Sequence, residues 1–447
     1  MFSVFINSWK NKDVRRKIVF TLVIIAIFRL GSNLFVPFLN QAGIQAMLGD
    51  GSSILNFLDS MTGGALGKGT IFAMSITPYI NASIIIQLLT VALPPLERLQ
   101  KEGTTGRKKI DAIKRVLALT IGLFQATAFY FGLKKQGAVL YTEGITGVIV
   151  MLAIILSFVA GAMVIMWLGD CISRNGVGNG ISIILLVGIV SRAPHDIMTL
   201  INNTVGTGDP TKYPYVLLVG LSYTAMVVLV VLMNNSERRI PVQYAKRQVG
   251  RKMYGGQSSF IPIKVAMTGV MPIIFAMSLM SLPPTVLYFF GIDGQITAQG
   301  DNDELHPILS GAVHLFNAPA NFNWQAVVYM VVYLLLIVGF NYFYVAMQYN
   351  PVEIANNLKR SNGSIPGYRP GKPTSDHIYH SLSRITLIGA LMLGVIAIFP
   401  MAFAYATGLK GLNLGGTSLL IIVSVILELV RQLEGQMVMR RRKGFLD

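Results

Sequence analysis

Residues Ser53-Ile-Leu-Asn-Phe-Leu-Asp-Ser-Met61 form a short apolar segment that is followed by a glycine-rich break and then by a long apolar window over residues 70–93. Helical spacing places five apolar side chains of the short segment on one stripe: Ile54, Leu55, Phe57, Leu58 and Met61. The segment is far shorter than the roughly 20 residues that a helix needs to cross a bilayer. It is therefore either a re-entrant element in a water-filled cavity or a helix lying on the membrane surface.

The composition outside this stretch is that of an integral membrane protein. The chain has 447 residues, of which 53% are hydrophobic and only 13% charged, and its mean hydropathy is +0.58. These values exclude an ordinary soluble globule. Cys171 is the only cysteine, which rules out a disulfide and a cysteine metal cluster.

Apolar windows of spanning length predict ten transmembrane helices. They cover residues 18–38, 70–93, 112–133, 148–169, 181–201, 214–233, 264–290, 325–348, 384–407 and 416–433. Most of the 37 basic residues fall in the two tails and the even-numbered loops. Because cytoplasmic loops are enriched in Lys and Arg, we expect both termini to be cytoplasmic.

The order of the windows predicts two halves, residues 1–203 and 204–447, with five spans each. An odd number of spans per half inverts the second half in the membrane relative to the first. The second window of each half contains a proline, Pro78 and Pro272, in a similar apolar setting. Corresponding proline-interrupted spans point to a central site between the halves.

Two polar side chains lie in matching parts of these proline-containing windows: Gln87 and Ser278. They are either a polar seam between the halves or ordinary interhelical contacts. Arg29 lies inside the first window, where a charge is costly, and the sequence suggests no partner for it.

No residue constellation predicts catalysis, and we expect neither an enzyme nor a cofactor. The glycines of residues 176–180 have the wrong spacing for a phosphate-binding loop. His377 and His380 lack a further nearby ligand, so we expect no metal. The acidic residues Asp50, Asp59, Asp170 and Glu353 fall at or beyond window ends, which argues against a proton-coupled transporter.

Two long basic loops, residues 234–263 and 349–383, are expected on the cytoplasmic side. Ile240, Val242 and Tyr244 alternate as in a hairpin strand. Basic loops can simply set the topology and contact anionic lipid. Their length and internal pattern favour docking to a large anionic partner.

Several motifs closely resemble the SecY family of bacterial protein-conducting channels. They occur in order along almost the whole chain: Gly63-Gly64-Ala65-Leu66, Thr77-Pro78-Tyr79-Ile80, Ala82-Ser83-Ile84-Ile85-Ile86-Gln87, Gly176-Val177-Gly178-Asn179-Gly180-Ile181-Ser182, Tyr244-Ala245-Lys246-Arg247, Asn350-Pro351, Arg369-Pro370-Gly371 and Gly415-Gly416-Thr417-Ser418-Leu419-Leu420.

The resemblance implies a clamshell of two inverted five-helix halves around a central pore that passes unfolded secretory polypeptides and releases hydrophobic segments sideways into lipid. Residues 53–62 would be the plug helix, and Gln87 and Ser278 would line the lateral gate. The pore constriction would consist of six residues: Ile76, Ile80, Leu185, Ile189, Ile274 and Ile421. Leu185 stands where the family favours isoleucine.

The resemblance also implies partners. These are the SecE and SecG subunits, the SecA motor ATPase, the ribosome and nascent chains with signal sequences, in a bacterial plasma membrane. The expected docking residues are Arg247, Arg251, Lys252 and Arg369. The chain contains no nucleotide site, so the driving force has to come from a partner.

Two other function classes remain. A secondary transporter is also built from inverted repeats, and it would have a buried polar solute site in place of an apolar constriction. A scaffold without conduction would leave the short segment and the two prolines unexplained. The external residues 291–323 match no motif.

Overall fold

The computed structural model describes residues 9–41, 43–44, 59, 62–135, 137–141, 143–204, 213–244, 247–249, 252–254, 258–289, 322–407 and 416–443. Each of the ten expected windows overlaps one helix. These helices are α2 (Lys12–Gly31), α5 (Thr77–Ala92), α7 (Thr104–Lys135), α8 (Gly144–Asn175), α9 (Gly180–Thr204), α10 (Tyr213–Asn235), α11 (Met271–Phe289), α13 (Trp324–Gln348), α15 (Lys372–Thr407) and α16 (Gly416–Lys443).

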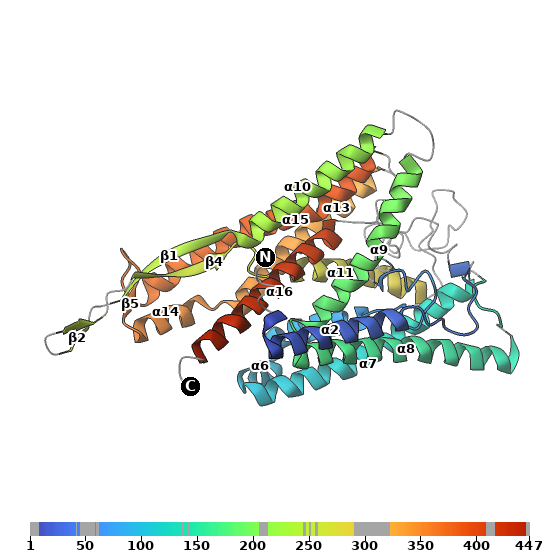
Figure 1. Cartoon of the computed structure of the whole chain (residues 1–447), viewed down its shortest axis with the longest axis horizontal. Helices are drawn as coiled ribbons and strands as arrows, with labels where there is room; N and C mark the ends of the chain where they lie inside the picture. The colour runs from blue at the N-terminus through green and yellow to red at the C-terminus, as the bar shows by residue number, and fades with distance from the viewer. Residues whose placement is uncertain are drawn as a thin grey trace.

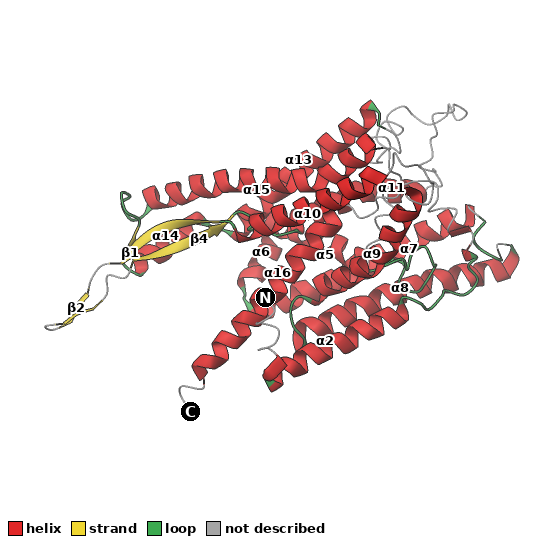
Figure 2. Ribbon diagram, turned by 45° about the horizontal axis from the view of Figure 1, so that its top comes forward, coloured by secondary structure: helices red, strands yellow, loops and turns green. Residues whose placement is uncertain are grey.

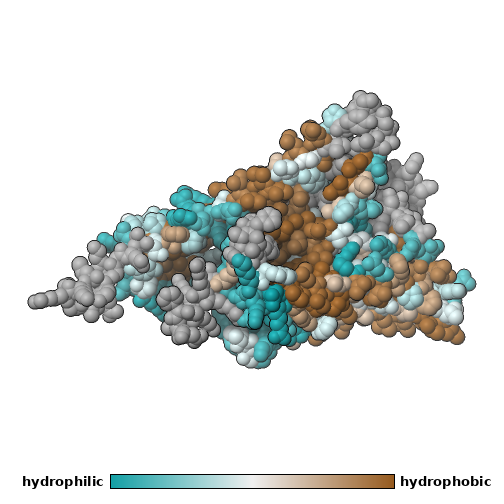
Figure 3. All heavy atoms as spheres, in the orientation of Figure 1, coloured by the Kyte–Doolittle hydropathy of each residue, from teal (hydrophilic) through white to brown (hydrophobic). Residues whose placement is uncertain are grey.

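The outer surface of the helices is apolar, as a lipid-facing surface must be. Among the described residues, six helices are long and apolar enough to cross a membrane, or seven if α5 and the short α6 (Pro94–Lys101), bent by 100°, form one span. Large apolar side chains such as Leu152, Leu217 and Leu221 are more than half exposed. Figure 3 shows this apolar surface over the helical body. The chain is a multi-pass membrane protein, and the count of ten spans stays a prediction.

Both prolines that were expected to interrupt a span instead begin a helix. Residues 70–76 and 265–270 are turns, and α5 and α11 start at Thr77 and Met271, so that Pro78 and Pro272 lie in the first turn. Proline is tolerated there because its missing N–H has no partner within the helix anyway. The two windows are therefore shorter helices, each preceded by irregular backbone.

The helices form two groups (Figure 1). In one, α7 lies against α5 and α8, and α8 against α2; in the other, α13 lies against α11 and α15, and α10 against α15 and α16. Each group has its own buried cluster, one around Phe158 of α8 and the other around Tyr333 of α13. A third cluster contains side chains from both groups. The groups meet where α9 lies against α16 and where α11 lies against α7 and α5.

A small antiparallel sheet joins the two long basic loops (Figure 2). Strand β1 (Glu237–Tyr244) pairs with β4 (Ser258–Lys264), with Ile240 opposite Ile261, and also with β5 (Gly363–Ser364). The predicted strand is confirmed, with Ile240 and Val242 buried against α14 (Pro351–Arg360) and α15. The loops therefore form one folded unit with its own apolar core.

Candidate functional site

The six residues expected at the constriction lie in one buried apolar cluster, and we call them the apolar ring: Ile76, Ile80, Leu185, Ile189, Ile274 and Ile421. They come from the start of α5, from α9, from α11 and from α16, and thus from both helix groups. None is more than 9% exposed.

Helix geometry accounts for the pairs within the ring. Leu185 and Ile189 are four residues apart on α9 and therefore share one face. Ile76 caps α5, and its carbonyl accepts the N–H of Ile80 at 3.0 Å, which places these two side chains one turn apart. The ring offers only branched alkyl groups, which can exclude water but cannot bind a fixed polar group.

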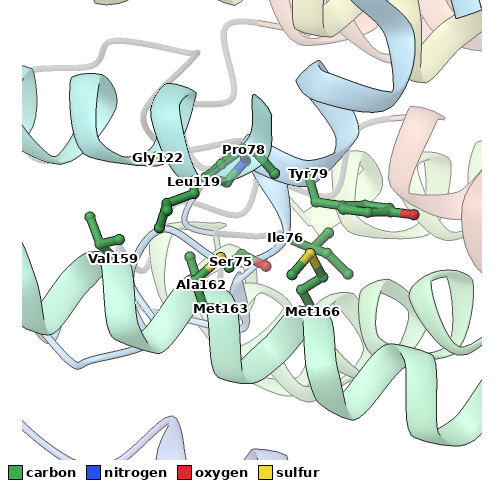
Figure 4. A pocket seen from close by; sticks show the side chains of 11 residues that line it. Ser75, Ile76, Pro78, Tyr79, Leu119, Gly122, Val159, Ala162, Met163 and Met166 are labelled. Carbon is green, nitrogen blue, oxygen red and sulfur yellow. The ribbon is translucent and has the colours of Figure 1, made fainter. Parts of the chain in front are cut away.

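The irregular segment before α5 positions Ile76. It runs directly over α8, since a Cβ atom on Gly161 would lie 2.0 Å from the carbonyl oxygen of Ile71. Ser75 adopts a φ of 49°, and its buried Oγ has no partner among the described residues. A small cavity lies beside it between α5, α7 and α8, with Met163 and Met166 on the α8 side (Figure 4). Close packing on α8 thus fixes the entry to α5.

The two residues expected at the lateral gate lie on facing helices. Gln87 of α5 donates from Nε2 to the hydroxyl of Tyr344 on α13 at 3.5 Å, and its Oε1 is buried without a described partner. The Tyr344 ring in turn packs on Phe275 of α11, with ring centroids 5.6 Å apart. Ser278 is half-buried on α11. The contact of Gln87 therefore links the two helix groups.

The apolar stripe of the short segment, Ile54, Leu55, Phe57, Leu58 and Met61, lies outside the described residues. The neighbouring Asp59 is described and buried. Its carboxylate forms an ion pair with Arg192 of α9, and Arg192 also donates from Nε to Asp196 at 3.2 Å. Asp196 lies in the fifth apolar window. The expectation that carboxylates fall only at or beyond window ends is thus wrong for Asp196, which is tolerated because Arg192 pairs with it.

Arg29 lies in the last turn of α2, not in the middle of a span, because the helix ends at Gly31. There its positive charge interacts favourably with the negative end of the helix dipole. Its guanidinium donates to Oγ of Ser191 on α9 at 2.8 Å. The structure therefore supplies the partner that the sequence left unnamed.

The described residues among the four expected for docking lie in the folded loop unit and in the turn before α15. Arg247 and Lys252 lie on the paired strands β2 (Arg247–Val249) and β3 (Lys252–Tyr254), which extend away from the helices in Figure 1, and Arg251 lies outside the described residues. Arg369 is exposed in the turn before α15, where its carbonyl accepts the hydroxyl of Thr374 at 2.8 Å. The backbone that presents Arg369 is thus held in place.

The sequence reasoning missed Tyr344 and the Arg192–Asp196 pair. The Arg192–Asp196 pair could have been predicted from the sequence, because opposite charges four residues apart inside an apolar window lie on one helix face and compensate each other. Tyr344 could not, since it is one of several tyrosines on α13. Of the histidines, His377 stacks on Tyr368 with ring centroids 4.0 Å apart.

Comparisons with known proteins agree with this architecture. The SecY family model matches residues 70–430. The protein translocase subunits SecY of Mycobacterium tuberculosis (strain H37Rv) and Halalkalibacterium halodurans are both 38% identical, each covering 100% of both chains.

Solved structures share the fold. A protein-conducting channel has a TM-score of 0.62 at 20% identity and covers 95% of this chain and 93% of its own. A SecY protein whose plug domain stabilises the closed state of its translocation channel has a TM-score of 0.65 at 18% identity, covering 95% of this chain and 92% of its own. Sec61 from a canine ribosome-channel complex has a TM-score of 0.59 at 19% identity, covering 95% and 93%.

Proposed function

This chain belongs to the SecY family of protein translocase subunits and is a protein-conducting channel, not an enzyme, and from that premise we propose how its residues close and open the pore. The apolar ring is the constriction through which an unfolded secretory polypeptide passes. Residues 53–62 are the plug that closes the external side of the ring. The convergence of six branched apolar side chains from four elements on one buried cluster is the observation that carries this assignment.

The chemistry of the ring suits a channel that has to accept any sequence. A narrow opening lined only by alkyl groups loses its water and so blocks ions. The same groups form no hydrogen bonds with a passing peptide backbone, so they do not select among polypeptides. A polar solute site, which a secondary transporter needs, would require donors or acceptors at this position.

Lateral release requires the two helix groups to part. We assign the halves to residues 1–203 and 204–447, with α5 and α7 of the first half separating from α11 and α13 of the second like the two parts of a clamshell. Gln87 and Ser278 line this gate. The bond from Gln87 to Tyr344 crosses it and stabilises the closed gate.

The driving force and the remaining subunits come from partners. SecE and SecG complete the membrane complex, and the ribosome and the SecA motor dock on the basic loop unit through Arg247, Arg251, Lys252 and Arg369. The folded sheet supports this role, because it holds the basic strands β2 and β3 away from the helices. Anionic lipid contacts the remaining basic residues. The protein resides in a bacterial plasma membrane with both termini in the cytoplasm.

Crosslinking to a stalled secretory chain tests the pore assignment. A cysteine replaces Ile80 in a Cys171→Ser background, in membranes that contain the partner subunits, and the stalled chain carries one cysteine. A disulfide adduct that depends on the signal sequence is expected, because Ile80 lies in the ring.

Leu152→Cys in the same background is the matched control, since Leu152 is 51% exposed on the outer face of α8 and should give no such adduct. If neither Ile80→Cys nor Ile274→Cys yields an adduct while the stalled chain is bound at the cytoplasmic loops, the ring is not the conducting path.

A further inference from the structure

A buried ion pair fastens the described end of the short segment to α9. Asp59 is 3% exposed, and its carboxylate pairs with the guanidinium of Arg192, whose side chain is 12% exposed. Arg192 also donates to Asp196, one helical turn further along α9. Two buried carboxylates therefore share one guanidinium.

The same aspartate organises the loop that follows it. Its Oδ1 accepts the N–H of Gly67 at 2.7 Å, and its main-chain carbonyl accepts the N–H of Gly64 at 2.8 Å and the hydroxyl of Thr62 at 2.9 Å. These bonds tie Asp59 to the loop of residues 62–67, so the ion pair of Asp59 also anchors this loop.

A second contact lies beside the first. Gly63 adopts a φ of +71°, and a Cβ atom built on it would lie 2.5 Å from Oγ of Ser191 and 3.0 Å from the Arg29 guanidinium. The loop therefore rests directly on α9 and on the end of α2. Only glycine combines this backbone conformation with this close approach.

The ion pair lies next to the apolar ring. Ile189 and Arg192 are three residues apart on α9 and so share a face. Ala65, in the middle of the loop, is 1% exposed and belongs to the same apolar cluster as the ring. The loop thus contributes Ala65 to the cluster that contains the ring, and its ion pair lies on the α9 face that bears Ile189.

We propose that Asp59, Arg192 and Asp196 form a charged latch that holds the loop of residues 62–67 against α9 in the closed pore and releases it when a polypeptide enters. This inference rests on the proposed channel function and adds a residue-level device to it. The latch resists opening because breaking one partner out of a buried pair is costly while the site stays dry.

Release of the loop is reversible because the Arg192 guanidinium pairs with two carboxylates, those of Asp59 and Asp196. When the loop leaves, Arg192 keeps Asp196 as its partner, so α9 retains charge compensation. Asp59 passes from its ion pair into the water that an open pore admits. No buried charge is then left without a partner or solvent, and the latch can form again.

Asp59→Asn tests the latch with the smallest change. The amide oxygen can still accept the N–H of Gly67, while the oxygen that faces Arg192 is replaced by a neutral NH2 group, so the ion pair is lost. We expect the ion conductance of the idle channel, and the export of a precursor with a defective signal sequence, to rise about tenfold or more.

Asp111→Asn is the matched control, because Asp111 pairs with Lys114 at 3.5 Å on the exposed surface of α7. It should leave both readouts at the wild-type level. Wild-type conductance and signal dependence in Asp59→Asn, at normal amounts of membrane protein, would overturn the latch.

A reversible crosslink covers the case in which a variant folds poorly. Asp59→Cys and Arg192→Cys, in the Cys171→Ser background, are joined by a short disulfide-forming bifunctional reagent. Export should stop while the link is in place and recover after reduction, which a misfolded protein would not do. Export at full rate with the link intact would show that the loop need not move.

These outcomes separate the latch from the channel function. If Ile80→Cys in the Cys171→Ser background gives the signal-dependent adduct but the latch variants behave as wild type, only the latch is wrong. If Ile80→Cys gives no adduct, the proposed pore itself fails.

Discussion

At the scale of single residues, the proposed seal depends on the chemistry of the ring side chains. The ring brings together branched alkyl groups from α5, α9, α11 and α16, and Leu185 takes part as the isoleucines do, with 3% of its surface exposed. Leucine and isoleucine have the same volume, so the departure from the family preference at this position leaves the cluster closed.

Ile274→Asn should make the closed channel leak ions and accept weaker signal sequences. The substitution places a carboxamide in a cluster without partners for it, which costs about 1–3 kcal/mol and favours water in the pore. The measurements are conductance of the idle channel and export of precursors with defective signals.

Leu279→Asn on the same helix is the control, because Leu279 is 38% exposed and outside the cluster. Equal leak in both variants would point to general damage to α11 instead of a specific role of the ring.

At the scale of elements, two tyrosines of α13 form hydrogen bonds with different neighbouring helices, depending on which helix each one faces. The hydroxyl of Tyr344 accepts a bond from Gln87 of α5, across the helix groups. The hydroxyl of Tyr342, two residues earlier, donates to the carbonyl of Ser383 on α15 at 3.2 Å, within its own group. Position around the helix thus decides whether a bond joins the two helix groups or stays within one.

Tyr344→Phe should lower the hydrophobicity that a segment needs for lateral release into lipid. The lost bond is long, so its contribution is of the order of 0.6 kcal/mol, about a threefold shift in partitioning. The assay is membrane insertion of a graded series of apolar segments.

Tyr342→Phe makes the same chemical change within one group and should leave the insertion threshold unchanged. A larger shift for Tyr342→Phe than for Tyr344→Phe would contradict the assignment of the gate to α5 and α13.

The sheet is the second element with a testable role. Val242→Asp would put a charge into the core formed by β1, α14 and α15, where Val242 is 2% exposed, and should lower the local unfolding free energy by about 3 kcal/mol. Hydrogen exchange in residues 237–264 measures this loss. Gln243→Asp, on the exposed neighbouring position, should change the exchange little.

At the scale of the whole molecule, the two sides of the membrane have different proposed functions. Basic residues concentrate on the side of the sheet and of Arg369, where an anionic partner can dock. Arg369→Glu should impair motor-driven export several-fold, because the reversed charge repels that partner, while the amount of folded protein stays constant. In vitro export of a purified precursor measures the loss.

Lys134→Glu is the control. It reverses a charge at the C-terminal end of α7, away from the proposed docking surface, and should leave the same export rate unchanged. Normal export by Arg369→Glu would remove Arg369 from the docking surface.

The amino-acid sequence by itself determined the class of protein and the positions of the long helices, and it predicted six ring residues that the structure places in one buried apolar cluster. Apolar length and the distribution of basic residues are local properties, so the ten windows each overlap a helix and β1 forms where the alternation predicts it. The ring assignment followed from the resemblance to the SecY family.

Only the tertiary structure decided how distant residues are paired. The helix starts at Pro78 and Pro272 depend on which backbone N–H groups find partners, and hydropathy alone does not report this. The contacts of Asp59 with Arg192, of Arg29 with Ser191 and of Gln87 with Tyr344 join residues far apart in the chain. A charge inside an apolar window shows that a partner must exist, but packing of the helices selects which one.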